Sequence, residues 1–142
     1  MTDIDLSGSG SPMIIPCEHG SLHGSLLLQP DSPGIIVLAH AALALDGRDA
    51  RLAGFLRQAG LSTLSVDLLA HSEEHFPDVH GNVPLLARRL LLFLDQIRHR
   101  MLMGEFPVQP IGLCAANTTS AVVIRIASQR DHDIAAICRT DA

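Results

Sequence analysis

The sequence predicts an α/β domain in which strands and helices alternate around a mostly parallel sheet. Residues 35–39 form an unbroken apolar run, rich in β-branched side chains, which is typical of a strand buried on both faces of a sheet. Helical apolar periodicity appears at 52–59 and 83–97, and each of these segments is followed by another strand-like run, at 61–68 and 108–115. The chain has 142 residues, 47% of them hydrophobic, which is enough to bury one core.

The N-terminal part is predicted to be a tail followed by a hairpin. Residues 1–11 end in alternating glycine and serine, so we expect a flexible tail before a single domain over 12–142. Two short extended runs follow at 13–15 and 21–28. The turn residues between them favour an antiparallel hairpin.

Two amphipathic helices are expected to cover the sheet. The first should end at Gly60, and the second should begin near Pro84 and end at Gly104. The predicted apolar stripe of the first helix consists of Leu52, Phe55, Leu56 and Ala59. The predicted buried stripe of the second helix consists of Val83, Leu86, Leu90, Phe93, Leu94 and Ile97. Its predicted solvent side consists of Arg88, Arg89, Asp95, Gln96, His99 and Arg100.

A polar stretch at 71–82 is predicted to be a solvated acidic loop. Its segment His71-Ser72-Glu73-Glu74-His75 raises the question of a metal site, because two histidines four residues apart on a helix can bind zinc. The pattern is not H-E-x-x-H, and Pro77 and Gly81 favour a loop, so we predict no metal. Asp67, at the end of the preceding strand, either lines a ligand site at the carboxyl ends of the strands or caps a loop, and the second role is favoured.

A third helix over 118–128 and a last strand over 134–138 complete the predicted order. Right-handed crossovers between parallel strands should place the helices on both faces of the sheet. A sheet that stops at 134–138 has an apolar edge strand, so we expect a homodimer or an additional domain to cover it.

Composition excludes several classes of partner. The net charge is −5 and the arginines are scattered, so no nucleic acid is predicted. The longest apolar stretch, 85–94, is interrupted by two arginines and is too short for a membrane span. The three cysteines, Cys17, Cys114 and Cys138, lack C-x-x-C spacing, and the N-terminus lacks a secretory signal. We therefore expect a cytoplasmic protein with reduced thiols.

Several segments together resemble the opening of an enzyme family. These segments are Ser21-Leu22-His23-Gly24-Ser25-Leu26, Gly34-Ile35-Ile36-Val37-Leu38-Ala39-His40, Ala59 to Leu69, Val83 to Leu90, and Pro110-Ile111-Gly112-Leu113. In this order, from Ile14 to Arg139, they resemble the dienelactone-hydrolase-like branch of the α/β-hydrolases. The resemblance implies an α/β-hydrolase-like fold that is truncated at its C-terminal end, no cofactor, and a small-molecule ester or lactone as substrate if the chain is active.

The resemblance also assigns the region that would hold the substrate and the oxyanion. In the family, the first parallel strand ends in His-Gly, and backbone N–H groups beyond it help to form the oxyanion hole. Here His40 is followed by Ala41, whose Cβ narrows the path to the substrate. The corresponding region consists of His40, Ala41, Ala115 and Thr118. His40 either lines this site or shapes the loop through backbone hydrogen bonds.

The nucleophile elbow departs from the family pattern. The family has G-x-S-x-G or G-x-C-x-G at a strained turn from strand to helix. Counted from Pro110-Ile111-Gly112, the elbow falls on Ala115-Ala116-Asn117-Thr118-Thr119, which places an amide, Asn117, at the nucleophile position. In an alternative register, Gly112-Leu113-Cys114-Ala115-Ala116, the nucleophile is Cys114.

The other members of a catalytic triad have no clear place. The acid and the histidine should follow the nucleophile along the chain, and the titratable residues downstream are Asp131, His132, Asp133 and Asp141. We therefore expect a relative of dienelactone hydrolases that is inactive or incomplete, and we leave open whether it is an enzyme. The alternative is an ester or lactone hydrolase that uses Cys114, with the acid and the histidine from missing sequence or a partner chain. A nucleotide-binding domain is disfavoured because His40-Ala41-Ala42, rather than a glycine-rich loop, follows the first parallel strand.

Overall fold

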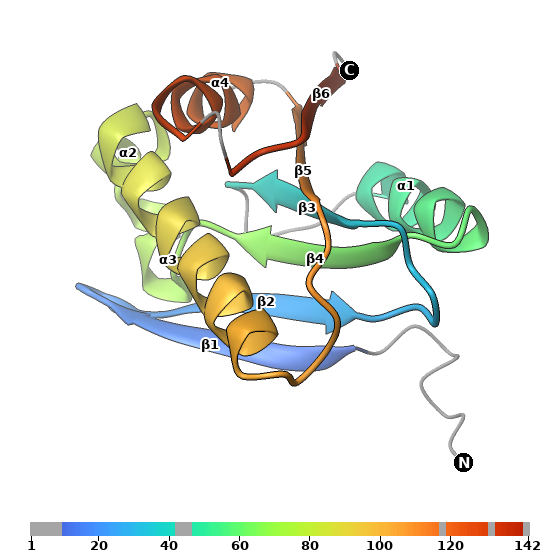
Figure 1. Ribbon diagram of the computed structural model, residues 1–142. Helices are drawn as coiled ribbons and strands as arrows, with labels where there is room; N and C mark the ends of the chain where they lie inside the picture. Colours follow the sequence, from blue (N-terminus) through green and yellow to red (C-terminus); the bar gives the residue numbers. More distant parts are fainter. Residues whose placement is uncertain (1–9, 42–46, 117–118, 131–132, 141–142) are drawn as a thin grey trace.

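The computed structural model describes residues 10–41, 47–116, 119–130 and 133–140 (Figure 1). Its strands are β1 (Ser11–Cys17), β2 (Gly20–Leu27), β3 (Ile35–His40), β4 (Ser62–Asp67), β5 (Ile111–Ala116) and β6 (Ala136–Thr140). Its helices are α1 (Gly47–Gln58), the 3₁₀ helix η2 (His71–His75), α2 (Pro77–His80), α3 (Val83–Leu102) and α4 (Thr119–Gln129).

The strands form one mixed sheet in the order β1-β2-β4-β3-β5-β6. The hairpin of β1 and β2 is antiparallel, and β2 pairs antiparallel with β4. β3 lies at the centre, parallel to both β4 and β5, and β6 continues the parallel part beside β5. The predicted α/β class, the N-terminal hairpin and the mostly parallel sheet are confirmed.

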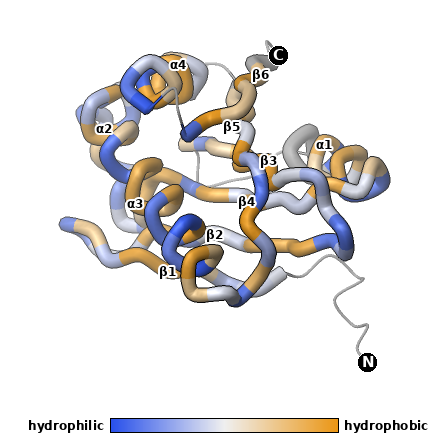
Figure 2. The backbone as a smooth tube through the Cα atoms, in the orientation of Figure 1, coloured by the Kyte–Doolittle hydropathy of each residue, from blue (hydrophilic) through white to orange (hydrophobic). Residues whose placement is uncertain are grey.

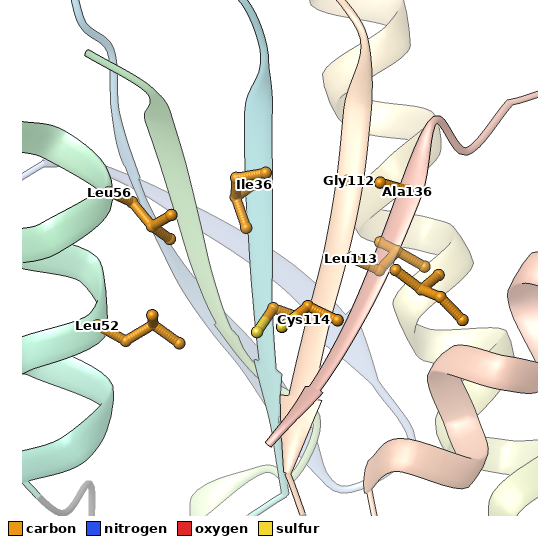
Figure 3. A pocket seen from close by; sticks show the side chains of 9 residues that line it. Ile36, Leu52, Leu56, Gly112, Leu113, Cys114 and Ala136 are labelled. Carbon is orange, nitrogen blue, oxygen red and sulfur yellow. The ribbon is translucent and has the colours of Figure 1, made fainter. Parts of the chain in front are cut away.

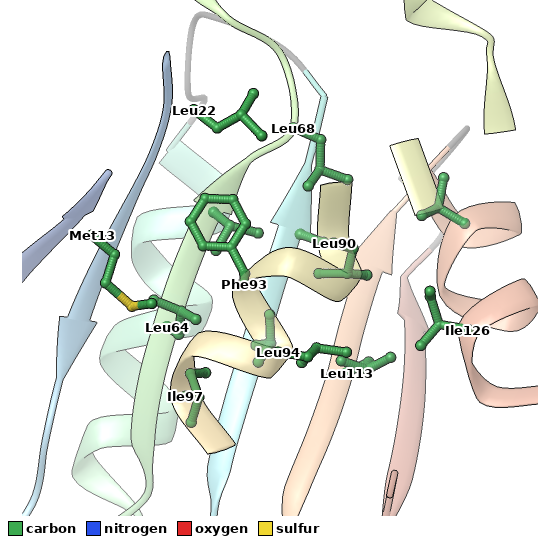
Figure 4. Packing of buried hydrophobic residues seen from close by; sticks show 14 of the residues in the cluster. Met13, Leu22, Leu64, Leu68, Leu90, Phe93, Leu94, Ile97, Leu113 and Ile126 are labelled. Carbon is green, nitrogen blue, oxygen red and sulfur yellow. The ribbon is translucent and has the colours of Figure 1, made fainter. Parts of the chain in front are cut away.

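Helices cover both faces of the sheet, as predicted. α3 and α4 contact each other on one face, and α4 also contacts β3, β5 and β6. α1 contacts β3 and β4 from the other face (Figure 1). The larger core lies under α3 and α4, where Phe93 of α3 is fully buried among aliphatic side chains (Figure 4). Figure 2 shows hydrophobic residues along the central strands and a hydrophilic segment in the turn between β2 and β3.

Several element boundaries differ from the prediction. β5 begins at Ile111 rather than at 108, and Val108 is 75% exposed, because Pro107 and Pro110 cannot donate to a strand ladder. β6 begins at Ala136, two residues later than predicted. β1 begins at Ser11, within the segment predicted as a tail, and residues 1–9 lie outside the described part of the chain.

The predicted buried stripe of α1 is partly wrong. Phe55 is 68% exposed and Ala59 is also exposed, whereas Leu52 and Leu56 face the sheet. α1 is the only described helix on its face of the sheet, whereas α3 and α4 pack against each other on the other face. Phe55 therefore has no described neighbouring helix to pack against. The predicted stop is correct, since α1 ends at Gln58 and Gly60 adopts a positive φ of 88°.

The stretch at 71–82 is not a solvated loop. It contains η2 and α2, and Glu73 is fully buried. Arg89, which was predicted on the solvent side of α3, is only 3% exposed. Within the described residues, the helices are all too short or too polar to cross a membrane.

Candidate functional site

The carboxyl ends of β4, β3 and β5 lie side by side at one end of the sheet, here called the carboxyl edge. Open α/β sheets bind ligands at this end of their strands. His40 ends β3 and is the register partner of Asp67, which ends β4. Ala39 is the register partner of Ala115, and β5 ends one residue later at Ala116. This edge therefore brings together His40, Ala41 and Ala115, three of the residues predicted for the substrate and oxyanion region.

His40 and Ala41 lie half-buried at the centre of this edge. The carbonyl oxygen of His40 accepts a hydrogen bond from the backbone N–H of Leu68 at 2.8 Å. That bond ties the end of β3 to the segment leaving β4. Ala41 packs against the core, so its Cβ occupies space that a glycine would leave open.

A row of polar side chains crosses the edge from β2 to β3. The register pairs Asp67 with His23 of β2 on one side and with His40 of β3 on the other. Directly paired residues project from the same face of a sheet, so Asp67 and the two histidines lie on one face, with Asp67 on the middle strand. Sequence reasoning did not find this row, because the antiparallel pairing of β2 with β4 was not predicted.

Asp67 caps the loop after β4, as expected, and its environment shifts its acidity. Its Oδ1 accepts a hydrogen bond from the backbone N–H of Leu69 at 3.0 Å. Burial raises the pKa of Asp67 from 3.8 to about 6, and the negative charge of Glu73 raises it further against the opposing effect of that hydrogen bond. The carboxyl group therefore changes its charge close to neutral pH.

Cys114 lies inside β5 rather than at its end. It is the fourth residue of the strand, it is 5% exposed, and its register partners are Leu38 and Cys138. Its side chain points to the α1 face of the sheet, where it lines an apolar cavity of about 120 Å³ together with Leu52 and Ile36 (Figure 3). A side chain at mid-strand lies away from the carboxyl edge that carries His40.

The preferred nucleophile position lies outside the described residues. β5 ends at Ala116 and α4 begins at Thr119, and residues 117 and 118 fall between them. Asn117 and Thr118 are those two residues. Thr119 and Ser120 are buried at the start of α4, and the Ser120 hydroxyl has no hydrogen-bond partner among the described residues.

A buried ion pair beside this edge was missed by the sequence analysis. Glu73 of η2 and Arg89 of α3 form a two-point contact, with Arg89 Nη1 donating to Oε1 and Nη2 donating to Oε2, both at 2.8 Å. Arg89 Nη1 also donates to the carbonyl oxygen of Leu68 at 2.9 Å, and the backbone N–H of Ala70 donates to Glu73 Oε1 at 2.7 Å. The pair therefore holds the chain just after β4 against α3.

The hairpin turn completes this network. Arg89 Nη2 donates to Oε1 of Glu18 at 2.9 Å, and Nδ1 of His19 lies 2.8 Å from Glu73 Oε2. Hydrogen bonds from Arg89 are the largest influence on Glu73 and lower its pKa to about 2, despite the opposing effect of burial. Hydrogen bonds to Glu73 in turn raise the pKa of Arg89. Both groups are therefore charged throughout the neutral range.

A signal for the buried arginine was present in the sequence. Arg89 lies three residues after Leu86 and four before Phe93, so it falls within the buried stripe of α3. An arginine in such a stripe requires a buried partner.

The described residues contain no cluster of three or more His, Cys, Asp or Glu side chains that could hold a metal ion.

Several solved protein structures are similar to the fold of this chain. The chain is similar to a dienelactone hydrolase from Anabaena variabilis, with 26% sequence identity over 90% of the chain and a TM-score of 0.74. It is also similar to Est1E from Butyrivibrio proteoclasticus, with 16% identity over 91% of the chain and a TM-score of 0.68. An α/β serine hydrolase homologue from Coxiella burnetii has 14% identity over 92% of the chain and a TM-score of 0.68. No protein-family model and no curated protein sequence matches the chain.

The similarity covers most of this chain but only part of the other proteins. The chain spans 62% of the Anabaena and Coxiella proteins and 49% of Est1E. The mixed six-stranded sheet, with β3 at its centre and helices on both faces, corresponds to that shared portion. The chain therefore has an α/β-hydrolase-like fold, resembling dienelactone hydrolase and other α/β serine hydrolases.

Proposed function

We propose that this chain is a dienelactone-hydrolase-like domain that does not hydrolyse esters by itself, and that its carboxyl-edge site binds small carbonyl-containing molecules. The observation that carries the proposal is the position of Cys114 at mid-strand, on the cavity side of β5. An acyl-transfer nucleophile of this fold belongs at the turn from strand to helix. The chain has Asn117 between the end of β5 and the start of α4, and an amide does not form an acyl intermediate.

The polar groups at the edge support a binding role. His40 and Asp67 are half-buried and adjacent in register, and a carboxyl group with a pKa of about 6 can donate or accept a hydrogen bond near neutral pH. A carbonyl oxygen of an ester or lactone is a suitable acceptor for the protonated form. This gives the site a way to orient a ligand without a covalent step.

The direct test is hydrolysis of a small activated ester, p-nitrophenyl acetate, by the purified native chain. Cys114→Ala and Asn117→Ser serve as variants, with circular dichroism as the check that each one folds. We expect the ester to be hydrolysed no faster in the presence of the native chain or of Cys114→Ala than in buffer alone. We also expect no gain in Asn117→Ser, because a serine without a general base is not activated.

Turnover by the native chain that is lost in Cys114→Ala would overturn the proposal in favour of a cysteine hydrolase. In that case the Cys114 thiolate would attack the ester carbonyl, and the acid and the histidine would come from outside the described residues. Binding is tested separately by ligand-observed NMR with γ-butyrolactone. Saturation transfer that is present in the native chain and lost in His40→Ala supports the carboxyl edge as the binding site, and transfer that is equal in both contradicts it.

A further inference from the structure

Two cysteines are cross-strand neighbours on β5 and on β6, the outermost parallel strand of the described sheet. Cys114 of β5 and Cys138 of β6 are register partners in a parallel ladder. Neighbouring strands lie about 4.8 Å apart, and paired residues project from the same face. A disulfide accommodates Cα atoms about 4.4–6.8 Å apart. The two cysteines are therefore close enough to be bridged.

The two thiols share one cavity but differ in access. Both line the apolar cavity between α1 and the sheet, and Figure 3 shows Cys114 and Ile36 on the sheet side of this cavity. Cys114 is 5% exposed, whereas Cys138 is exposed on the edge strand. Gly112 and Ala136, which lie two residues before the cysteines on the same strands, are small residues that line the same cavity. A reagent in solution can reach Cys138 first, and the buried thiol lies next to it.

We propose that Cys114 and Cys138 form a redox-active dithiol, which low-molecular-weight disulfides oxidise to an intrachain disulfide between β5 and β6. Cys138 is the attacking thiol and Cys114 is the resolving thiol. This site is independent of the carboxyl edge and of any ester chemistry. It uses the buried cysteine that the proposed function leaves without a catalytic role.

The reaction consists of two thiol–disulfide exchanges. Cys138 loses its proton to solvent, and its thiolate attacks one sulfur of the reagent RS–SR, which forms a mixed disulfide on Cys138 and releases RS⁻. Cys114 then loses its proton, and its sulfur attacks Sγ of Cys138, which forms the Cys114–Cys138 bond and releases the second RS⁻. The two released thiolates take up the two protons. One reagent disulfide is thus reduced to two thiols while the dithiol is oxidised.

The product would cross-link the edge strand to the sheet. The bridge closes the chain from 114 to 138, a segment that includes the whole of α4. Closing such a loop restricts the unfolded chain. We therefore expect the melting temperature to be higher for the oxidised chain than for the reduced chain.

The test uses the reduced full chain and oxidised glutathione. After incubation, remaining thiols are alkylated in acid-quenched samples, and peptides are mapped by mass spectrometry without reduction. The native chain should show a Cys114–Cys138 linked peptide, two hydrogen atoms lighter than the reduced pair, and should retain no glutathione on either of these cysteines. Dithiothreitol should reverse the change. Cys17 lies on β1, at the opposite edge of the sheet, so Cys17→Ser should behave like the native chain.

Two further variants separate the steps. Cys138→Ser, a change at an exposed position, should form no disulfide within the chain and show no rise in melting temperature. Cys114→Ser should retain glutathione on Cys138, because the resolving thiol is absent. The proposal is overturned if the native chain keeps glutathione on Cys138 without the linked peptide. Disulfide-linked dimers through Cys138, or no reaction of either cysteine, would equally overturn it.

Discussion

At the scale of single residues, the Glu73–Arg89 pair joins three separate parts of the chain. Glu73 belongs to η2 and Arg89 to α3, and Arg89 also reaches Glu18 in the hairpin turn. Both members of the pair are almost completely removed from water. Breaking such a pair by removing one charge is costly because the other charge remains buried without compensation.

Replacing Glu73 by Gln should destabilise the fold by about 3–5 kcal/mol, because Arg89 would keep its charge without its partner. Equilibrium urea unfolding measures this change. Glu105→Gln, at an exposed position outside this network, is the matched control and should change stability by less than about 0.5 kcal/mol. A native-like stability of Glu73→Gln would show that the buried pair is not needed.

The free energy of unfolding of the native chain at acid pH should depend on the charge of Glu73. Its pKa is lowered to about 2 in the fold, so its stabilising contribution is complete above its ordinary value of 4.5. That contribution is lost as the pH falls from 4.5 towards 2. Urea unfolding over this range should show a steeper loss of stability for the native chain than for Glu73→Gln. Parallel curves would contradict the assignment.

The ionisation of Asp67 should lower the stability of the fold, whereas that of Glu73 raises it. Its folded pKa is raised from 3.8 to about 6, so the unfolded chain loses this proton at a lower pH than the folded chain. The group therefore subtracts stability as the pH rises through that interval. Asp67→Asn keeps an oxygen for the Leu69 N–H and should be more stable than the native chain at neutral pH by roughly 1–2 kcal/mol, after allowance for partial solvent screening. The two should be equal near the ordinary pKa of Asp67, and a difference independent of pH would contradict the prediction.

Among the described helices, α3 contributes the most residues to the buried core. Phe93 is fully buried against the sheet, and even the Cβ of an alanine at Gly24 of β2 would come within 3.0 Å of its ring. Phe93→Ala should cost about 3–5 kcal/mol of stability, as measured by chemical denaturation. Phe55→Ala on α1 makes the same chemical change at a side chain that is 68% exposed, so it should cost far less. Equal losses would contradict the packing described for the two helices.

The order of elements was predictable, whereas several of their environments were not. Apolar runs and periodicity identified β3, α3 and the hairpin, since those signals are local. The buried position of Glu73 and the exposure of Phe55 depend on which elements share a face, which is a property of the tertiary packing. For the candidate site, the strand ends carrying His40 and Asp67 were predictable, but the row with His23 depends on a long-range strand pairing.

For the whole molecule, the edge strand β6 bears on association with another chain. β6 is an edge strand of the described sheet, and its Ile137 is 44% exposed. Exposed apolar edge strands favour pairing with another chain or domain. We therefore predict that the purified chain self-associates, and that Ile137→Lys weakens this association. Light scattering coupled to size-exclusion chromatography measures both. A native chain that stays monomeric as its concentration is raised would contradict the prediction.

Whether Cys114 acts as an acyl-transfer nucleophile decides between the two functions weighed for this chain. Peptide mapping after brief exposure to p-nitrophenyl acetate identifies directly which side chain, if any, takes the acetyl group. We predict that Cys114 remains unmodified, because it is 5% exposed and faces the cavity under α1 rather than the carboxyl edge. Rapid acetylation of Cys114, followed by hydrolytic release of the acetyl group, would contradict this prediction and identify a working cysteine hydrolase.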